Sequence, residues 1–277
     1  MQVVGLCRFS YPAIGGFQRD QGSLEARKAY LYDRTRLEHR FRLFETFCLP
    51  SIANQTDQEF TFSILIGDGL PDWAYGRLEN LTQAIPMIKI VPRAPGVQRL
   101  VAADVINAAR QPEFDLCAQF RLDDDDAMNV IFVEMLRDIG PNLSALYPDA
   151  PMIGIDFHKG YSATIEQGEI LTSQVVHQYL TCAMACFVRR GVRQTCMNFK
   201  HHKIYEIMPT VSDGRFPMFI RSLHQANDSN ALANNDGKPF DPPSPEIAEW
   251  LQDLFGINTR TVKEIWHDFS AGRFAKS

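Results

Sequence analysis

The sequence of 277 residues contains no CxxC pair, no run of lysines and arginines, and no apolar stretch close to the length of a membrane-spanning helix. A transmembrane helix needs about 20 mostly apolar residues in a row. Nucleic-acid-binding domains are usually basic, whereas this chain has a formal net charge of -5. These absences predict a chain that has no transmembrane segment and does not bind nucleic acid.

The six cysteines stand mostly in apolar surroundings, which favours reduced thiols in the core over a disulfide framework. Reduced thiols are typical of the cytoplasm. The N-terminus shows neither a basic leader nor an apolar run long enough for a signal peptide. We therefore expect a cytoplasmic protein.

Glycine-rich phosphate loops are also absent, since neither GxxxxGK[ST] nor GxGxxG occurs. A phosphate-transferring enzyme would normally carry such a loop. Internal repeats and low-complexity tracts are missing as well. Hydrophobic residues make up 45% of the chain, which is ordinary for a globular protein with a sizeable core.

The first ~140 residues alternate between strand and helix patterns. Short buried runs predict strands at 3–7, 60–66, 85–91 and 115–122. Apolar residues at helical spacing predict helices at 36–49, closed or kinked by Pro50, at 100–110, and from Met128 to Ile139. The polar stretch 10–28 is expected to be a long loop, and Pro92 is expected to end the third strand. This order predicts an α/β fold whose mostly parallel sheet carries helices on both faces.

The second half is less regular. It is expected to contain strands at 152–157 and 182–188, a hairpin at 161–171, a loop at 224–243, and helices at 244–256 and 259–269. Ser244 and Pro245 provide the cap and first residue of the helix that begins there. Trp250 and Trp266 lie on apolar helix faces and are expected in the core rather than stacked on a sugar. We expect one domain with two lobes, 1–140 and 141–277.

Four adjacent aspartates, Asp123 to Asp126, directly follow the strand at 115–122. Neighbouring carboxylates repel one another unless they are solvated or neutralised by a cation. Ligands of open α/β sheets bind at the carboxyl ends of the strands, where this run is expected. Capping of a following helix would explain one or two aspartates, but four in a row favour a functional site.

Mg²⁺ and Mn²⁺ prefer carboxylate oxygens and leave coordination positions open for phosphate. Alternate residues of an extended segment point the same way, so two pairs could converge on a cation. The pairs are Asp123 with Asp125 and Asp124 with Asp126. A metal held there could bridge a diphosphate and offset the charge that develops as it leaves.

Several phrases of the sequence carry a resemblance to a known family. The segment from Gly96 through Asn107 to the aspartate run resembles the nucleotide-sugar half of GT-A glycosyltransferases, which have a Rossmann-like sheet and an Asp-x-Asp signature after a strand. More narrowly, the chain resembles the bacterial rhamnosyltransferase family. The phrases concerned are Arg8-Phe9, Leu49-Pro50-Ser51-Ile52, Gly67-Asp68-Gly69-Leu70-Pro71 and Arg121-Leu122 with the aspartates that follow.

The resemblance implies a GT-A fold with 1–140 as the nucleotide-sugar-binding half and 141–277 as an irregular acceptor-binding half with C-terminal helices. It implies a hexosyltransferase that uses a nucleotide-sugar donor, a divalent metal (Mn²⁺ or Mg²⁺), and a glycan or lipid-linked saccharide as acceptor. Such an acceptor could be met at the inner membrane surface. The rival class is a non-catalytic, metal-dependent sugar- or nucleotide-binding protein.

The same resemblance assigns roles in the donor site. Asp123 becomes the ribose contact and Asp125 the metal ligand, with His224 completing the metal site and His201 or His202 as rivals for that role. The remaining donor-binding candidates are Arg8, Asp68, Arg99, Asp124 and Asp126, with Arg34 as a further phosphate contact. Asp68 could equally be a turn residue between glycines.

The resemblance also implies an inverting displacement, in which a carboxylate of the second half accepts the proton of the acceptor hydroxyl. The candidates for this base are Asp156 and Asp213, followed by Glu169. His158 is expected to border the acceptor site.

Overall fold

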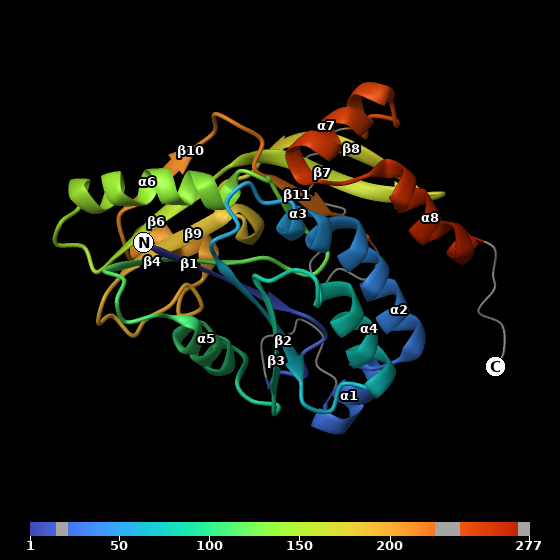
Figure 1. The fold of residues 1–277 in the computed structure, drawn as a ribbon, viewed down its shortest axis with the longest axis horizontal. Coiled ribbons are helices and arrows are strands. Elements are labelled where there is room, and N and C mark those ends of the chain that lie inside the picture. The colour runs from blue at the N-terminus through green and yellow to red at the C-terminus, as the bar shows by residue number, and fades with distance from the viewer. Residues whose placement is uncertain (15–21, 225–238, 271–277) are drawn as a thin grey trace.

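The computed structural model describes residues 1–14, 22–224 and 239–270. Strands in this part of the chain form one sheet of seven and another of four (Figure 1). The larger sheet has the order β10 (Thr210–Asp213), β6 (Met152–Phe157), β9 (Met184–Arg189), β4 (Leu116–Arg121), β1 (Gln2–Arg8), β2 (Thr61–Gly67), β3 (Ile88–Arg93). The smaller has the order β5 (Ala127–Met128), β11 (Phe219–Ser222), β7 (Lys159–Glu166), β8 (Glu169–Val176).

The larger sheet is mostly parallel. β1 pairs in parallel with β2 and β4, β2 with β3, and β6 with β10. Only β9 runs the other way, because it pairs antiparallel with both β4 and β6. The carboxyl ends of the other six strands therefore meet at one edge of the sheet, as the strand and helix pattern predicted.

Helices cover both faces of this sheet, which confirms the predicted α/β layers (Figure 1). Alternate residues of β1 serve the two faces, with Val3 and Cys7 in one buried cluster and Val4 and Leu6 in another. The first cluster packs against α2 (Arg34–Leu43), α4 (Asp72–Thr82) and α6 (Phe132–Leu146). The second packs against α5 (Gln98–Ala109).

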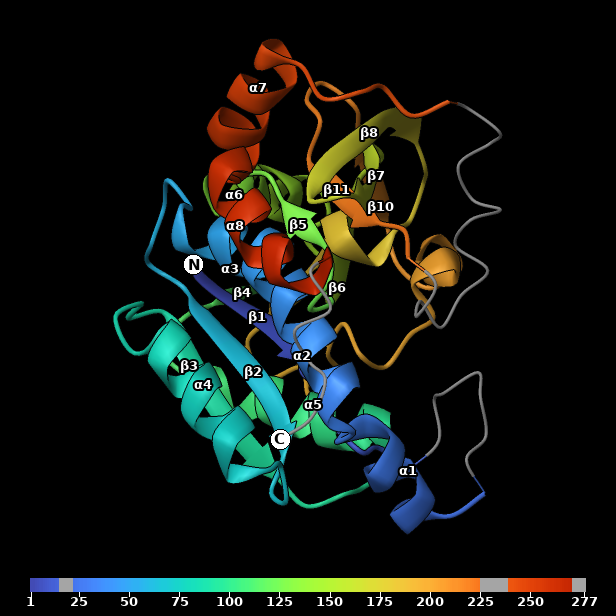
Figure 2. The ribbon, with the colours of Figure 1, turned by 90° about the vertical axis from the view of Figure 1, so that its right-hand side faces the viewer.

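The smaller sheet has a cluster of its own with α7 (Pro245–Phe255) and α8 (Thr259–Ser270). In Figure 2, α7 lies at the end of the molecule opposite β3 and α4, and α8 runs from it toward the middle of the view. Trp250 stacks on Tyr161 with ring centroids 4.3 Å apart, and the indole N–H of Trp266 donates to Thr46 Oγ1 at 2.9 Å. Both tryptophans thus pack against the protein, as predicted.

The helix after the aspartate run begins later than predicted. α6 starts at Phe132, and Met128 belongs instead to the short strand β5. Ile131 occupies the N-cap position, so the four aspartates do not cap this helix. The capping explanation of the run is therefore wrong, since the backbone leaves β4 and forms another strand before turning into α6.

One more prediction about a helix is wrong and another is right in part. Part of the expected loop 10–28 is helical, because α1 (Leu24–Leu31) begins after Ser23, whose hydroxyl accepts from the Ala26 N–H at 3.1 Å. Pro50 does not close the helix that precedes it, because α3 (Leu49–Ala53) continues through it. The helix is irregular directly before Pro50, where the π-helical segment η1 (Phe44–Cys48) follows α2.

Pro92 lies inside β3 rather than at its end. β3 is the edge strand of the sheet, and an edge tolerates a residue that cannot donate to a ladder. α4 falls in a stretch where no element was predicted. The predicted loop at 224–243 lies largely outside the described residues.

All six cysteines are buried and free, so the prediction of reduced core thiols is confirmed. Among the described residues, none of the helices combines the length and the apolar character that a membrane crossing requires.

Candidate active site

A cleft of about 740 Å³ opens at the carboxyl edge of the larger sheet, with Asp123 to Asp126 in its wall. The remaining lining comes from the ends of β1 and β4, the helices α1, α2 and α5, the segment around 180–202, and β11. Basic side chains are numerous among these residues: Arg8, Arg36, Arg40, Arg99, Arg121, Lys200 and Arg221. The cleft thus brings four carboxylates together with an excess of cations.

Asp123 is the most accessible of the four aspartates. Its side chain is 38% exposed, and Arg8 at the end of β1 lies 3.4 Å from its Oδ1. β1 and β4 are paired neighbours, so their carboxyl ends deliver Arg8 and Asp123 to the same place. Asp123 is therefore open to a ligand in the cleft.

Asp124 and Asp125 are buried, and both bind Arg40 of α2. The Arg40 guanidinium donates to both oxygens of Asp124, and its Nη1 donates to Asp125 Oδ2 at 3.1 Å. Burial alone would raise the pKa of Asp125, but Arg40 and His224 outweigh it and hold that pKa well below its usual range. Asp125 is consequently an anion inside the protein.

His224 follows β11, and its Nε2 lies 2.8 Å from Asp125 Oδ2. Within the described residues, no three His, Cys, Asp or Glu side chains are arranged so that they could hold a metal ion together. Mg²⁺ and similar cations commonly use one or two protein ligands, with substrate phosphates and water completing the shell. One carboxylate oxygen and one imidazole nitrogen this close together fit such a partial site, so Asp125 and His224 are compatible with a metal.

Asp126 is buried like Asp124 and Asp125, and it also lines the cleft. Its Oδ1 accepts from the backbone N–H of Ser222 in β11 at 3.1 Å. Burial raises the pKa of Asp126, and the negative charges of Asp125 and Asp123 raise it further, against the opposing effect of Arg221. Asp126 therefore links the aspartate run to the smaller sheet.

The structure does not bring every predicted donor contact into the cleft. Arg99 lines it, but Asp68 is an exposed residue beyond β2 that does not. Arg34 binds Glu38 at 3.1 Å and lies over the Trp73 ring at 3.9 Å, so it is engaged on α2. Asp68 lies in a tight turn after β2, in keeping with its alternative interpretation as a turn residue between glycines.

None of the predicted bases lines the cleft. Asp156 is fully buried, and its carboxylate accepts from the Tyr179 N–H at 2.8 Å and from Ser212 Oγ at 3.2 Å. Asp213 binds Arg215 at 2.6 Å, and Glu169 binds Lys263 at 2.6 Å.

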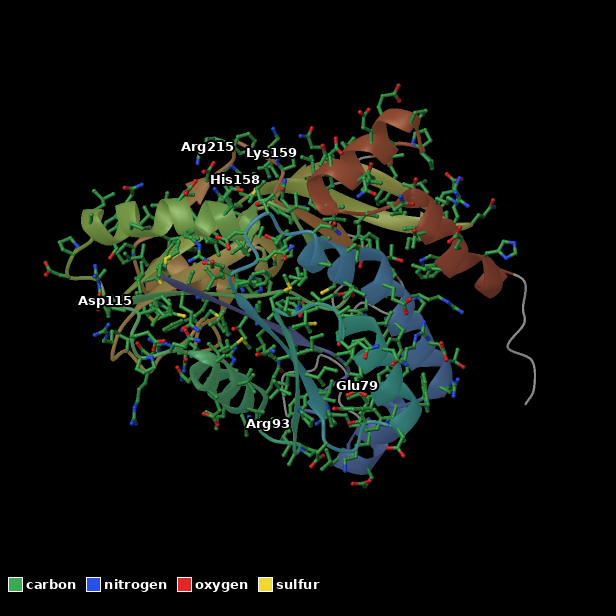
Figure 3. All side chains as sticks on the ribbon, in the orientation of Figure 1. Glu79, Arg93, Asp115, His158, Lys159 and Arg215 are labelled. Atoms are coloured by element: carbon green, nitrogen blue, oxygen red, sulfur yellow. The ribbon has the colours of Figure 1, made fainter. Side chains whose placement is uncertain are left out.

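Figure 3 places Arg215, the ion-pair partner of Asp213, beside His158 and Lys159, on the side of the molecule opposite Arg93. The backbone N–H of His158 donates to the carbonyl of Asp213 at 3.3 Å. These residues form a separate group outside the cleft.

The sequence alone did not single out Arg40 and Arg121, although both line the cleft. Arg40 lies among several arginines of an amphipathic helix, and nothing in that spacing distinguishes it from a solvated residue. Backbone strain is a further signal that only coordinates reveal. Ser10, which lines the cleft, has a positive φ of 49°. Tyr179, which directly precedes the lining residue Leu180, has a positive φ of 59°.

Comparison with known proteins identifies one family. The sequence model of the family described as "Putative rhamnosyl transferase" matches residues 2–236. A search of curated proteins finds no match.

Among solved structures, S. aureus TarS 1–349 is 11% identical, with a TM-score of 0.42, over 80% of this chain and 60% of that one. The same protein in complex with UDP-GlcNAc gives a TM-score of 0.42 and 11% identity over 98% of this chain and 72% of that one. A protein of Desulfovibrio desulfuricans G20 described as a "putative nucleotide-diphospho-sugar transferase" gives a TM-score of 0.38 and 10% identity, over 98% of this chain and 96% of that one. The chain thus spans less than two thirds of the first of these structures.

Proposed function

Since the chain belongs to the family described as "Putative rhamnosyl transferase", we propose that it is a metal-assisted glycosyltransferase that uses a nucleotide-sugar donor. The sugar is rhamnose, in keeping with the family description. The acceptor is a hydroxyl group of a glycan or of a lipid-linked saccharide, and the transfer inverts the anomeric centre.

One observation carries this proposal: the basic cleft contains an accessible aspartate and an ionised buried aspartate within one run of four. A nucleotide sugar carries a diphosphate, whose charge the arginines of the cleft would offset. Arginine suits this task because its planar guanidinium binds phosphate oxygens in pairs. The chemistry of the cleft therefore matches the charged part of such a donor.

The residues divide the work of binding. Arg8 and Arg99 would contact the diphosphate, and Asp123, with one side open to the cleft, would accept from the ribose hydroxyls. Arg40 holds Asp124 and Asp125 in place through its ion pairs with both. Cations fixed before the reaction stabilise the leaving diphosphate without the cost of reorganising.

Asp125 and His224 would hold the divalent cation, Mn²⁺ or Mg²⁺. A bound metal would act as a Lewis acid on the phosphate oxygens. Asp126, bonded to the Ser222 N–H, keeps the end of β11 and thus His224 near the aspartate run.

Calorimetric titration of UDP, GDP and dTDP, each with and without Mn²⁺ or Mg²⁺, tests the proposal. We expect one nucleotide to bind in a metal-dependent way and Asp125→Ala to lose that binding. Asp115→Ala is the matched control. Asp115 lies at the other end of β4 from Asp125 (Figure 3), and the Asp115 side chain is 90% exposed.

The outcomes separate the proposal from its rival. Failure of every nucleotide to bind under either metal would refute the transferase. Metal-dependent binding of a sugar or nucleotide, with no diphosphate released from any nucleotide sugar, would favour the non-catalytic binding protein.

Asp156 and Asp213, the carboxylates predicted as the base, are tested by the rate of transfer. A substitution at the true base should abolish transfer and leave nucleotide binding intact. Full rates in both the Asp156→Asn and the Asp213→Asn variants would show that neither residue is the base.

A further inference from the structure

His201 lines the cleft from the segment between β9 and β10, far along the sequence from Arg8 and Arg99. It is the first residue of the 3₁₀ helix η3 (His201–Glu206), and it lines the cleft together with Arg121 and Asp123. Its side chain is half-buried. A titratable ring therefore stands in the same cleft as the aspartate run.

A hydrogen bond fixes the tautomer of this ring. His201 Nδ1 lies 2.5 Å from the carbonyl oxygen of Tyr179. A carbonyl oxygen can only accept, so Nδ1 must carry the proton. In the neutral imidazole the lone pair is then on Nε2, at the other edge of the ring, where it can accept a proton.

The surroundings favour the neutral ring. Burial lowers the pKa of His201, and the positive charges of Arg121 and His202 lower it further. The bond to Tyr179 and the charge of Asp123 act in the opposite direction, and the net shift is downward from 6.5. Arg121 and Asp123 belong to β4 and its end, whereas His202 shares η3 with His201. The ring is therefore unprotonated at neutral pH.

Asp156 fixes the carbonyl that orients His201. Tyr179 has a left-handed φ of 59°, which is strained for a bulky residue. Its N–H donates to Asp156 Oδ1 at 2.8 Å, and Ser212 Oγ steadies the other carboxylate oxygen at 3.2 Å. The buried carboxylate thus holds the Tyr179 backbone in the conformation that presents its carbonyl to His201.

We infer that His201 is the general base of the reaction, and that Asp156 is a positioning residue that acts through the backbone of Tyr179. The inference rests on the proposed glycosyltransferase function. The acceptor hydroxyl gives its proton to His201 Nε2 while its oxygen forms the bond to the anomeric carbon. The bond from that carbon to the diphosphate oxygen breaks, and its electron pair leaves with the nucleoside diphosphate.

The test measures release of nucleoside diphosphate from dTDP-rhamnose, UDP-N-acetylglucosamine and GDP-mannose, with water as the acceptor. We expect His201→Gln to lower the rate about 10²–10⁴-fold, the usual contribution of a general base, with unchanged affinity for the nucleoside diphosphate. The glutamine amide can still donate to Tyr179 but cannot take up a proton. Lys203→Ala, an exposed residue of η3 that does not line the cleft, is the control and should keep the full rate.

The pH profile separates a base from a structural role. The wild-type rate should fall as the pH drops through the pKa of His201, below 6.5. This acid limb should be absent from the residual rate of His201→Gln. An acid limb that is the same in both proteins would overturn the inference.

Asp156 is tested by two substitutions. Asp156→Asn keeps an oxygen that accepts from the Tyr179 N–H, so most of the rate should remain. Asp156→Ala removes that oxygen and should lower the rate about 10- to 100-fold, the size of loss typical of groups that orient metal-bound histidines. A loss in Asp156→Asn as large as in His201→Gln would make Asp156 the base and contradict the inference.

The result also distinguishes this inference from the proposed function. A wild-type protein that neither binds a nucleoside diphosphate nor releases one would defeat both. If the wild-type protein and the His201→Gln variant were both fully active, His201 would not be the base, but the proposed glycosyltransferase function would be unaffected. Binding of the nucleoside diphosphate to each variant shows that the variant is folded.

Discussion

Asp125 and Asp156 are both buried at the same edge of one sheet, Asp125 beyond the end of β4 and Asp156 in β6, yet their surroundings act in opposite directions. Asp125 accepts from the Arg40 guanidinium and from His224, and its pKa is lowered. Asp156 accepts from a backbone N–H and a hydroxyl, and burial raises its pKa. A cation within bonding distance thus decides which buried carboxylate holds its charge.

The difference assigns the two carboxylates to different tasks. An anion held by Arg40 and His224 is suited to a cation and a charged donor. A carboxylate that receives only neutral donors is suited to fixing a backbone, here that of Tyr179. Sequence position alone gives no sign of this division, because both residues follow or end a buried strand.

Of the changes that test this comparison, Arg40→Ala should lower the stability most. It removes the guanidinium and leaves Asp124 and Asp125 as buried charges without their cationic partner. Breaking a buried ion pair typically costs about 3–5 kcal/mol of unfolding free energy. Denaturant unfolding of both proteins measures the loss.

Arg34→Ala is the control on the same helix, since Arg34 is 64% exposed and its pair with Glu38 contributes at most about 1 kcal/mol. An equal loss in the two variants would show that Arg40 has no special role in holding the aspartates.

The next effect concerns Arg8, which lies against the accessible Asp123 rather than the buried carboxylates. Arg8→Ala should remove a charged hydrogen bond to the diphosphate, which contributes about 1.5–3 kcal/mol. That corresponds to roughly a 10- to 100-fold weaker affinity for the nucleoside diphosphate in calorimetry. Stability should change little, and an unchanged affinity would remove Arg8 from the donor site.

The pH dependence of stability should separate Asp156 from Asp125 by sign. A raised folded-state pKa means that the native state binds the proton of Asp156 more tightly than the unfolded state does. The stability that protonated Asp156 confers is present below the unfolded pKa of ~3.9 and declines as the pH rises toward the folded pKa.

Asp156→Asn should therefore gain stability relative to the wild type as the pH rises through this window, as measured by denaturant unfolding. A relative loss over the same window would show that the native state favours the ionised form of Asp156.

The smallest effect is expected at the pair of Asp213 and Arg215, where the arginine is 63% exposed. The bonds from Arg215 lower the pKa of Asp213, so this pair stabilises the protein above the unfolded pKa of ~3.9, and the contribution is lost as the pH falls below it. Solvent screening should keep the loss of stability in Arg215→Ala well below that in Arg40→Ala at neutral pH. A loss comparable to that of Arg40→Ala would remove the contrast between buried and exposed pairs.

Much of the fold could be predicted from local patterns. Buried runs gave β1, β2 and β4 within a residue or two, and Ser244, Pro245 and Gly256 marked the ends of α7. These signals are local, since a cap or an apolar run acts on its own neighbours. The π-helical segment before Pro50 was missed because its hydrogen-bond register depends on packing rather than on any residue type.

The aspartate run was recognised because its four carboxylates are adjacent in the sequence. Which member is accessible, and which is neutralised, could not be predicted. Arg40 reaches Asp124 across 84 positions, and His224 reaches Asp125 across 99. Contacts over such separations exist only once the sheet has brought the strand ends together.

By itself, the sequence determined that the chain forms an α/β sheet with a cluster of carboxylates at the carboxyl end of one strand, since periodicity and adjacency are properties of a short stretch. Only the tertiary structure decided that Arg40 neutralises this cluster, that Asp156 is shut away from the cleft, and that His201 lines it with a fixed tautomer. The reason is physical: the charge of a buried group depends on its solvation and its nearest partners, and both are set by segments far apart in the chain.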